Sequence, residues 1–253
     1  MIKVVLIGSG NVAQQLIQAF AKSNKIDIVQ VFSRQKETIV PLFYSKKITT
    51  DFNDLAEADL YIIAISDDAI AKVSSQLPFN NRLVVHTSGS VRLDSLDSKN
   101  RRGVFYPLQT FTKGKVVDFS QIPICLESEN ETDFNLLEKV AQSISNNVFK
   151  SNEKQRKALH ISAVFVNNFV NEMYRIGNEI CEENKVPFEI LKPLILETVN
   201  KVMTLSPKEA QTGPAKRNDT QTIEAHLDFL SNENHVTIYK ILTQSIQNNG
   251  KEL

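Results

Sequence analysis

Cysteine is scarce in this sequence of 253 residues, occurring only as Cys125 and Cys181, and no C-x-x-C motif is present. Two isolated cysteines do not make the disulfide framework that stabilises many small secreted proteins. We therefore expect a reducing compartment, the cytoplasm, and we predict no metal site.

An excess of charge of either sign is also missing, because 29 Lys and Arg residues balance 29 Asp and Glu residues. Long-range attraction to nucleic acid or to an anionic membrane is therefore not expected. No apolar run approaches the roughly 18 residues that a spanning helix needs, and the apolar start of the chain stops at Gly8, too early for a signal peptide. These absences favour a small-molecule partner.

The first stretch of the chain has the pattern of a dinucleotide-binding turn. Residues 2–7 form a nearly continuous apolar run, typical of a parallel strand buried on both faces, and the sequence G-x-G-x-x-A follows. Gly8 allows the tight turn, Gly10 leaves no Cβ in the way of a pyrophosphate, and Ala13 lets the following helix pack closely. That helix, predicted over residues 11–22, points free N–H groups and its positive dipole end at the loop. We predict dinucleotide contacts from Gly8, Ser9, Gly10, Asn11, Val12 and Ala13; the alternative is a turn that serves packing only.

The residues after the second predicted strand, 28–32, indicate which dinucleotide binds. An acidic side chain at this position would bind the adenosine ribose and repel a 2′-phosphate, but the chain has Ser33 and Arg34 here, and Asp27 lies at the wrong end of the strand. A hydroxyl and a guanidinium favour NADP, because both can bind a phosphate. The alternative is a solvated basic loop.

Further predicted strands also end in polar residues, where ligands gather in parallel sheets. Residues 60–65 run into Ser66 and Asp67, and residues 83–85 run into residues 86–90. We predict that Ile65, Ser66, Asp67 and His86 lie at the cofactor and that Ser88 lies at the substrate. The competing explanation is local: Ser66 or Asp67 caps a helix over residues 69–77, and Ser90 caps a turn.

Strand and helix patterns alternate as far as residue 150, after which only helical patterns follow. The chain is therefore predicted to be an α/β protein, with a doubly wound, mainly parallel sheet followed by an all-helical domain. We place a dinucleotide-binding domain at residues 1–151. A helical domain for substrate binding and dimerisation follows at residues 152–253.

A long helix begins the helical half. Asn152 and Gln155 suit a capping box, and the helical pattern continues to about Glu183 with apolar residues on two faces, which predicts a buried central helix. His160, Asn167, Asn168 and Asn171 recur at spacings that place them near one line along it. Such polar groups must be hydrogen-bonded or face a cleft.

Shorter helices are predicted beyond the long one. Pro187 starts a helix that Pro193 kinks or restarts, and residues 206–209 form a second capping box. Residues 212–219 form a loop dense in turn residues and charge, in which Asp219 is a cap candidate. Helices follow over residues 220–230 and 233–247.

Together these stretches resemble a family of Rossmann-like, NADP-binding proteins whose C-terminal half is a helical domain of unknown function. The resemblance covers nearly the whole chain and rests on six motifs in this order: Gly8 to Ala13, Ser66 to Ile70, His86 to Gly89, Pro107 to Phe111, His160 to Phe169, and Gly213 to Asp219. The architecture is similar to the group of 6-phosphogluconate dehydrogenase, pyrroline-5-carboxylate reductase and the deazaflavin-dependent NADP reductases. It implies hydride transfer at a cleft between the domains and a homodimer through the helical domain.

Two departures from that group concern the reaction. Hydroxyacid members use a Lys and an Asn four residues apart on the long helix, whereas here His160 is followed four residues later by Val164. Related sequences often have His-Pro where this chain has Tyr106-Pro107.

The leading hypothesis is an NADPH-dependent reductase or dehydrogenase that acts on a small carbonyl, imine or hydroxy compound. His160 is the candidate acid or base, because imidazole exchanges protons near neutral pH; Asn168 is the candidate substrate ligand and Ser88 a second donor. Two alternatives remain open. The protein is a dinucleotide-binding sensor or scaffold without turnover, or His160 only satisfies a buried hydrogen bond.

Overall fold

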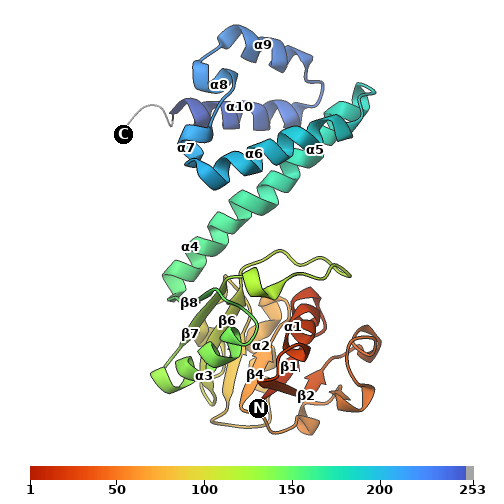
Figure 1. Cartoon of the computed structure of the whole chain (residues 1–253), viewed down its shortest axis with the longest axis vertical. Helices are drawn as coiled ribbons and strands as arrows, with labels where there is room; N and C mark the ends of the chain where they lie inside the picture. Colours follow the sequence, from red (N-terminus) through yellow and green to blue (C-terminus); the bar gives the residue numbers. More distant parts are fainter. Residues whose placement is uncertain (249–253) are drawn as a thin grey trace. The chain divides into compact units, whose positions relative to one another are not determined.

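The structure is a computed structural model that describes residues 1–248. It consists of two compact units, residues 1–168 and a helical unit that begins at Phe169 (Figure 1). The division falls inside the long helix, so the first part of that helix belongs to the unit that contains the sheet. No helix in the described part of the chain is both long and apolar enough to cross a membrane.

The first unit is built on an eight-stranded sheet, which confirms the predicted α/β class. The strand order is β3-β2-β1-β4-β5-β6-β7-β8, and every neighbouring pair is parallel except β6 and β7. The strands are β1 (Ile2–Ile7), β2 (Ile26–Phe32), β3 (Ile48–Thr49), β4 (Leu60–Ile63), β5 (Leu83–His86), β6 (Arg101–Pro107), β7 (Ile124–Ser128) and β8 (Val148–Lys150). The order changes direction between β1 and β4, the kind of switch point at which open α/β sheets bind ligands.

Helices cover both faces of the sheet, which explains why its central strands are apolar throughout. Val4 and Leu6 of β1 pack in one core with α1 (Asn11–Ala21) and α3 (Glu131–Gln142). Val5 and Ile7 of the same strand point to the other face, where they pack in a core with α2 (Ile70–Gln76). Consecutive strand residues alternate between faces, so both sets must be apolar.

Some local expectations for the first unit are wrong. Neither Ser66 nor Asp67 caps a helix with its side chain; a 3₁₀ turn, Asp67–Ala69, leads into α2 instead. Ser90 does not cap the turn either: its backbone N–H donates to the Ser88 hydroxyl, which closes the turn.

The long helix comprises α4 (Glu153–Ala163), a π-helical segment (Val164–Phe169) and α5 (Val170–Glu183). Asn152 and Gln155 form the predicted capping box. The expected burial of this helix is not found, since within this chain Ile161 is 50% exposed and Val166 is 74% exposed. A helix with two apolar faces is buried only if other elements cover both, and within the described chain these side chains remain in contact with solvent.

The second unit continues with further helices after α5. They are a 3₁₀ helix (Phe188–Leu191), α6 (Lys192–Thr204), α7 (Pro207–Ala210), α8 (Pro214–Arg217), α9 (Thr220–Phe229) and α10 (Glu233–Asn248). Pro193 lies in the first turn of α6, Ser206 and Glu209 form the predicted capping box, and Asp219 caps α9. The predicted loop at 212–219 contains one helical turn, α8, which Asn218 ends in the left-handed conformation at φ +53°.

Candidate functional site

The loop between β1 and α1 leaves space for a ligand at the helix N-terminus. Gly8 has φ +138°, and a Cβ there would lie 2.1 Å from the carbonyl oxygen of Ala64, so only glycine fits. At Gly10, the N-cap of α1, nothing lies within 4 Å of a Cβ position, and no side chain caps the helix. The first N–H groups of α1 therefore face open space, which suits an anion. Ala13 is fully buried and packs the helix on the sheet.

Ser33 and Arg34 follow β2 at the same edge of the sheet. The Ser33 hydroxyl donates to the Gln35 carbonyl (2.8 Å) and accepts from the Gln35 N–H (3.1 Å), so it closes a turn. The Arg34 side chain is exposed and forms no ion pair within residues 1–248. Lys72 of α2 and Phe52, which stacks on Phe32 at 4.1 Å, lie around the same space; sequence reasoning passed over both.

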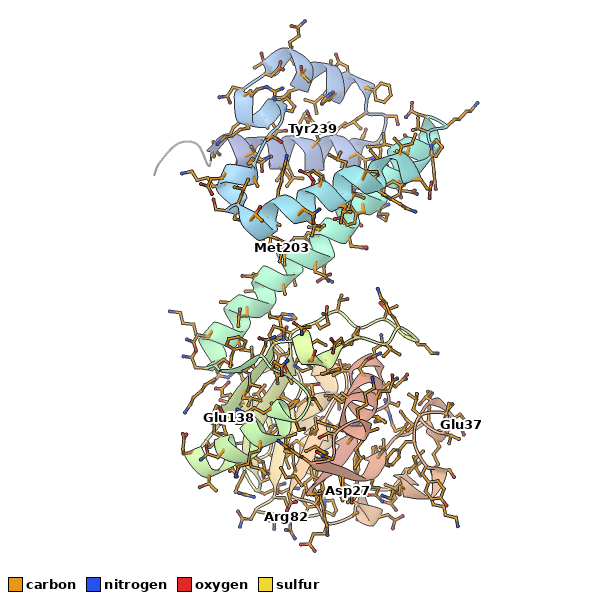
Figure 2. All side chains as sticks on the ribbon, in the orientation of Figure 1. Asp27, Glu37, Arg82, Glu138, Met203 and Tyr239 are labelled. Atoms are coloured by element: carbon orange, nitrogen blue, oxygen red, sulfur yellow. The ribbon has the colours of Figure 1, made fainter. Side chains whose placement is uncertain are left out.

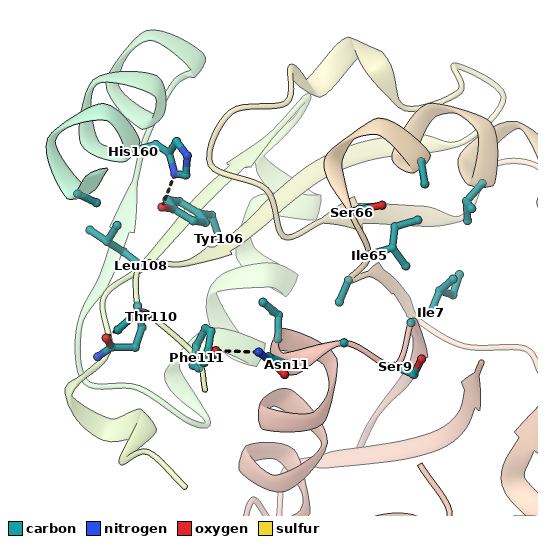
Figure 3. Close-up of a pocket in the computed structure, with 18 of the residues that line it drawn as sticks. Ile7, Ser9, Asn11, Ile65, Ser66, Tyr106, Leu108, Thr110, Phe111 and His160 are labelled. Atoms are coloured by element: carbon teal, nitrogen blue, oxygen red, sulfur yellow. Dashed lines mark hydrogen bonds between the residues drawn. The ribbon is translucent and has the colours of Figure 1, made fainter. Parts of the chain in front are cut away.

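These residues line one end of a cavity of about 1060 Å³, formed by the first unit alone (Figure 3). From the glycine loop it extends past Ile65 and Ser66 to Tyr106 and helix α4. The predicted site residues that line it are Gly8, Ser9, Gly10, Asn11, Val12, Ser33, Arg34, Ile65, Ser66, His160 and Asn168. Four others, Ala13, Asp67, His86 and Ser88, are not among its lining residues.

The segment after β6 closes the cavity over the glycine loop. The Asn11 amide donates to the Phe111 carbonyl oxygen at 2.9 Å (Figure 3). The Gln15 amide donates to the Lys115 carbonyl oxygen at 2.7 Å. Leu108, Gln109, Thr110 and Phe111 therefore form part of the wall. The Asn11 side chain is thus engaged with this segment, while its backbone belongs to the first turn of α1.

At the far end of the cavity, Tyr106 and His160 form a hydrogen-bonded pair. The Tyr106 hydroxyl and His160 Nδ1 lie 3.1 Å apart, joining the end of β6 to α4 (Figure 3). Burial raises the pKa of the Tyr106 phenol to about 12. At neutral pH the hydroxyl is therefore protonated and available as a donor or an acceptor. Tyr106 is the main site residue that sequence reasoning missed; the Tyr106-Pro107 departure from related sequences was the signal.

His86 and Ser88 are buried beside this pair rather than exposed to the cavity. His86 Nδ1 accepts from the Ser88 N–H at 3.1 Å, and the Ser88 hydroxyl accepts from the N–H groups of Ser90 and Val91. Burial, together with the neighbouring Arg156 guanidinium, lowers the pKa of His86 to about 4. His86 is therefore neutral at physiological pH and supports the turn that carries Gly89.

Arg156, one turn before His160 on α4, fixes the helix to the sheet. Its side chain is 1% exposed, pairs with Glu127 of β7 and donates to the Val91 carbonyl oxygen at 2.7 Å. An ion pair this buried holds its partners in a defined geometry. The position of His160 is set by this contact.

Asn167 and Asn168 line the cavity from the π-helical segment, whereas Asn171, expected on the same line, is not among the lining residues. A π-helical turn holds an extra residue and so shifts the side chains that follow it around the helix axis. This insertion could not be read from spacing alone. It explains why the predicted line of polar residues ends at Asn168.

Comparison with known sequences and structures identifies the family. Residues 3–89 match a family model described as NADP oxidoreductase, coenzyme F420-dependent, and residues 122–246 match a domain of unknown function, DUF2520. Over 98% of both chains, the protein is 38% identical to a Bacteroides fragilis protein assigned as an NADP oxidoreductase, and the crystal structure of that protein superimposes with a TM-score of 0.88. The chain belongs to this family of NADP oxidoreductases. No curated protein sequence gives a significant match.

More distant solved structures share the fold with this NADP oxidoreductase family member. A Thermotoga maritima protein is 20% identical, with 97% and 98% of the two chains aligned and a TM-score of 0.78. Pyrroline carboxylate reductase from Plasmodium falciparum, crystallised with NADP, is 16% identical, with 97% and 98% aligned and a TM-score of 0.60. The expected resemblance to the reductase group is therefore confirmed at the level of the fold.

Proposed function

We propose that this family member is an enzyme that uses NADP(H) to transfer a hydride to or from a small carbonyl, imine or hydroxy compound. The observation that carries the proposal is the single cavity that connects the glycine loop to the Tyr106–His160 pair. A cofactor cradle and a proton-exchanging side chain thus line one cavity, as hydride chemistry requires.

The residues present fit a dinucleotide. The open space at Gly10 and the uncapped start of α1 suit a pyrophosphate, and Arg34 and Lys72 offer unpaired cations to a 2′-phosphate. When bound, NADPH supplies the hydride. We propose NADP over NAD on the strength of these two cations. Ser33, whose hydroxyl is engaged with Gln35, shapes the loop.

The chain's own part in the reaction is to hold the substrate and move a proton. His160 lines the cavity and is proposed to exchange the proton at Nε2, since Nδ1 is held by Tyr106. Asn168, which lines the same cavity, is proposed to bind the substrate oxygen or nitrogen. Ser88 is proposed to act on the turn that carries Gly89, because its hydroxyl binds two backbone N–H groups there.

The test is NADPH oxidation by the whole chain against ketoacids, aldehydes, cyclic imines and a deazaflavin, the last because of the family description. His160→Ala should leave NADPH affinity unchanged, because the cofactor contacts come from other segments, and should lower kcat by roughly 10²- to 10⁴-fold. His160→Gln is the matched control: it restores the hydrogen-bonding capacity without the acid. Wild-type kcat in a folded His160→Gln variant would end the catalytic role of His160.

A non-catalytic sensor or scaffold is the second candidate. The observation that favours it is Val164, which stands where hydroxyacid members of the group have an asparagine partner for a catalytic lysine. NADPH binding without oxidation by any member of the panel would support this second function over the first.

We also propose a homodimer in the cytoplasm, with its interface in the helical unit. Large apolar side chains of α6 are exposed within this chain; Leu194 is 62% exposed and Met203 is 78% exposed. A second copy would remove such side chains from water.

A further inference from the structure

Tyr106 on β6 lies 54 residues before His160 in the sequence, and its hydroxyl is hydrogen-bonded to the His160 ring. Within the described chain the ring forms no second hydrogen bond. The imidazole and phenol rings meet edge-on, with centroids 6.0 Å apart and planes 64° apart. Tyr106 is itself buried, at 8% exposure, whereas His160 is half-buried. A buried phenol therefore holds a more exposed imidazole.

Gly89 shows that the fold leaves room for this pair. A Cβ at Gly89 would lie 2.7 Å from His160 Nδ1, 2.7 Å from Tyr106 Cζ and 2.9 Å from the Tyr106 hydroxyl. Real Cβ atoms do not approach other atoms so closely, so any other residue at position 89 displaces one of the two rings. The loop after β5, the end of β6 and helix α4 thus converge on one hydrogen bond.

The tyrosine hydroxyl can keep this bond in both protonation states of the histidine. It accepts from the Nδ1–H of the charged ring, and with the neutral ring it either accepts from Nδ1–H or donates to bare Nδ1, because a phenol has one donor and acceptor lone pairs. No other hydrogen bond of this hydroxyl occurs within residues 1–248. A phenylalanine could do neither.

We propose that Tyr106 is the positioning residue for His160, binding Nδ1 so that Nε2 is the ring nitrogen presented to the substrate. The proton transfer rests on the proposed function, while the positioning itself requires no turnover. In the reductive direction a proton moves from Nε2 of the charged ring to the substrate oxygen or nitrogen. The proton on Nδ1 stays on the ring and keeps donating its hydrogen bond to the tyrosine oxygen. NADPH, when bound, would supply the hydride that completes the reduction.

The first arm of the test needs no substrate. The ring nitrogens of the four histidines can be followed by ¹⁵N NMR, with His160 assigned from its loss in His160→Gln. Tyr106→Phe should shift the His160 Nδ1 resonance. The chain provides a matched control, because Tyr239 binds His226 Nδ1 at 2.8 Å in the second unit (Figure 2). Tyr239→Phe should shift His226 and leave His160 unchanged.

The second arm asks whether Tyr106 acts through His160. Tyr106→Phe should lower kcat about tenfold, the usual effect of losing one neutral hydrogen bond, with NADPH affinity unchanged. In a His160→Ala background the same change should have no further effect on kcat. Gly89→Ala, which displaces the pair without removing either ring, should mimic Tyr106→Phe in both arms.

The outcomes separate this proposal from the proposed function. An unchanged His160 Nδ1 resonance in folded Tyr106→Phe, or a further fall in kcat in the double variant, would overturn the positioning role. If none of the tested substrates supports NADPH oxidation by the wild-type chain, the proposed function fails. The NMR arm alone then decides the positioning role.

Discussion

Ser33 and Arg34 are neighbours at the end of β2, yet only one of their side chains is free to bind a ligand. Ser33 is 1% exposed and its hydroxyl is engaged with the backbone of Gln35, whereas Arg34 is exposed and lines the cavity. A cation without a partner does not have to break an existing ion pair when a phosphate binds. Cofactor preference should therefore depend on Arg34 rather than on Ser33.

We predict that NADPH binds roughly 10- to 100-fold tighter than NADH, the value of one charge-assisted contact. Arg34→Ala should remove most of this preference, leaving the part that Lys72 contributes. Lys36→Ala is the control, because Lys36 is also exposed and basic but does not line the cavity. Titration of each variant with both cofactors measures the effect, and equal affinities in the wild type would contradict it.

His86 makes a second prediction at the scale of a single residue. Its pKa is about 4 in the folded chain, against an ordinary value of 6.5, because burial opposes protonation. The unfolded chain therefore binds more protons between these pH values, and stability is complete above pH 6.5 and falls as the pH drops toward 4. We expect His86 to account for a loss of about 2 kcal/mol in unfolding free energy between pH 7 and pH 5.

The measurement is denaturant unfolding of the wild type and of His86→Asn at both pH values. Asparagine keeps an acceptor for the Ser88 N–H but cannot be protonated in this range. Between pH 7 and pH 5 the variant should therefore lose about 2 kcal/mol less unfolding free energy than the wild type, whatever its stability at pH 7. A parallel loss in both proteins would show that His86 is not responsible.

At the scale of elements, α4 is held to the sheet by Arg156. Replacing this residue with methionine would leave the Glu127 carboxylate, 19% exposed, without its partner. We expect a loss of about 3 kcal/mol in unfolding free energy, at the lower end for a broken buried pair because Glu127 can regain some water. Adding Glu127→Gln to this variant should recover part of the lost unfolding free energy.

The matched control is Arg175 of α5. It forms its ion pairs at the surface, with Glu172 and Glu179. Exposed pairs contribute little, so Arg175→Met should barely change the unfolding midpoint. If the two arginine variants lost equal stability, the buried pair would not be the element that fixes α4.

Sequence patterns predicted the structure well wherever residues close in sequence determine it. The glycine loop, the capping box at Asn152 and the cap at Asp219 depend on residues close in sequence, and all three are present. The Tyr106–His160 contact was missed because it depends on a strand pairing and a helix position far apart in the chain. The π-helical segment was missed because hydrophobic spacing does not reveal one extra residue in a turn.

At the scale of the whole molecule, the exposed apolar side chains of α6 predict self-association. Light scattering should give about 57 kDa, twice the chain mass of 28.5 kDa. Leu194→Lys should shift the mass toward the monomer, because a lysine ammonium resists removal from water. Val116→Lys is the control: Val116 has the same 62% exposure but lies in the first unit. A monomer mass across all concentrations would contradict the dimer.

The position of β1 in the sheet has a consequence during synthesis. Val4 pairs with Ile28 on one side and with Leu60 on the other, so β1 is a central strand that is made before both of its neighbours. At a ribosomal rate of roughly 5 to 20 residues per second, its second edge waits several seconds for β4. During that interval an apolar, β-branched segment exposes unpaired backbone groups, the condition in which strands aggregate. We therefore expect β1 to need protection from aggregation until β4 has left the ribosome.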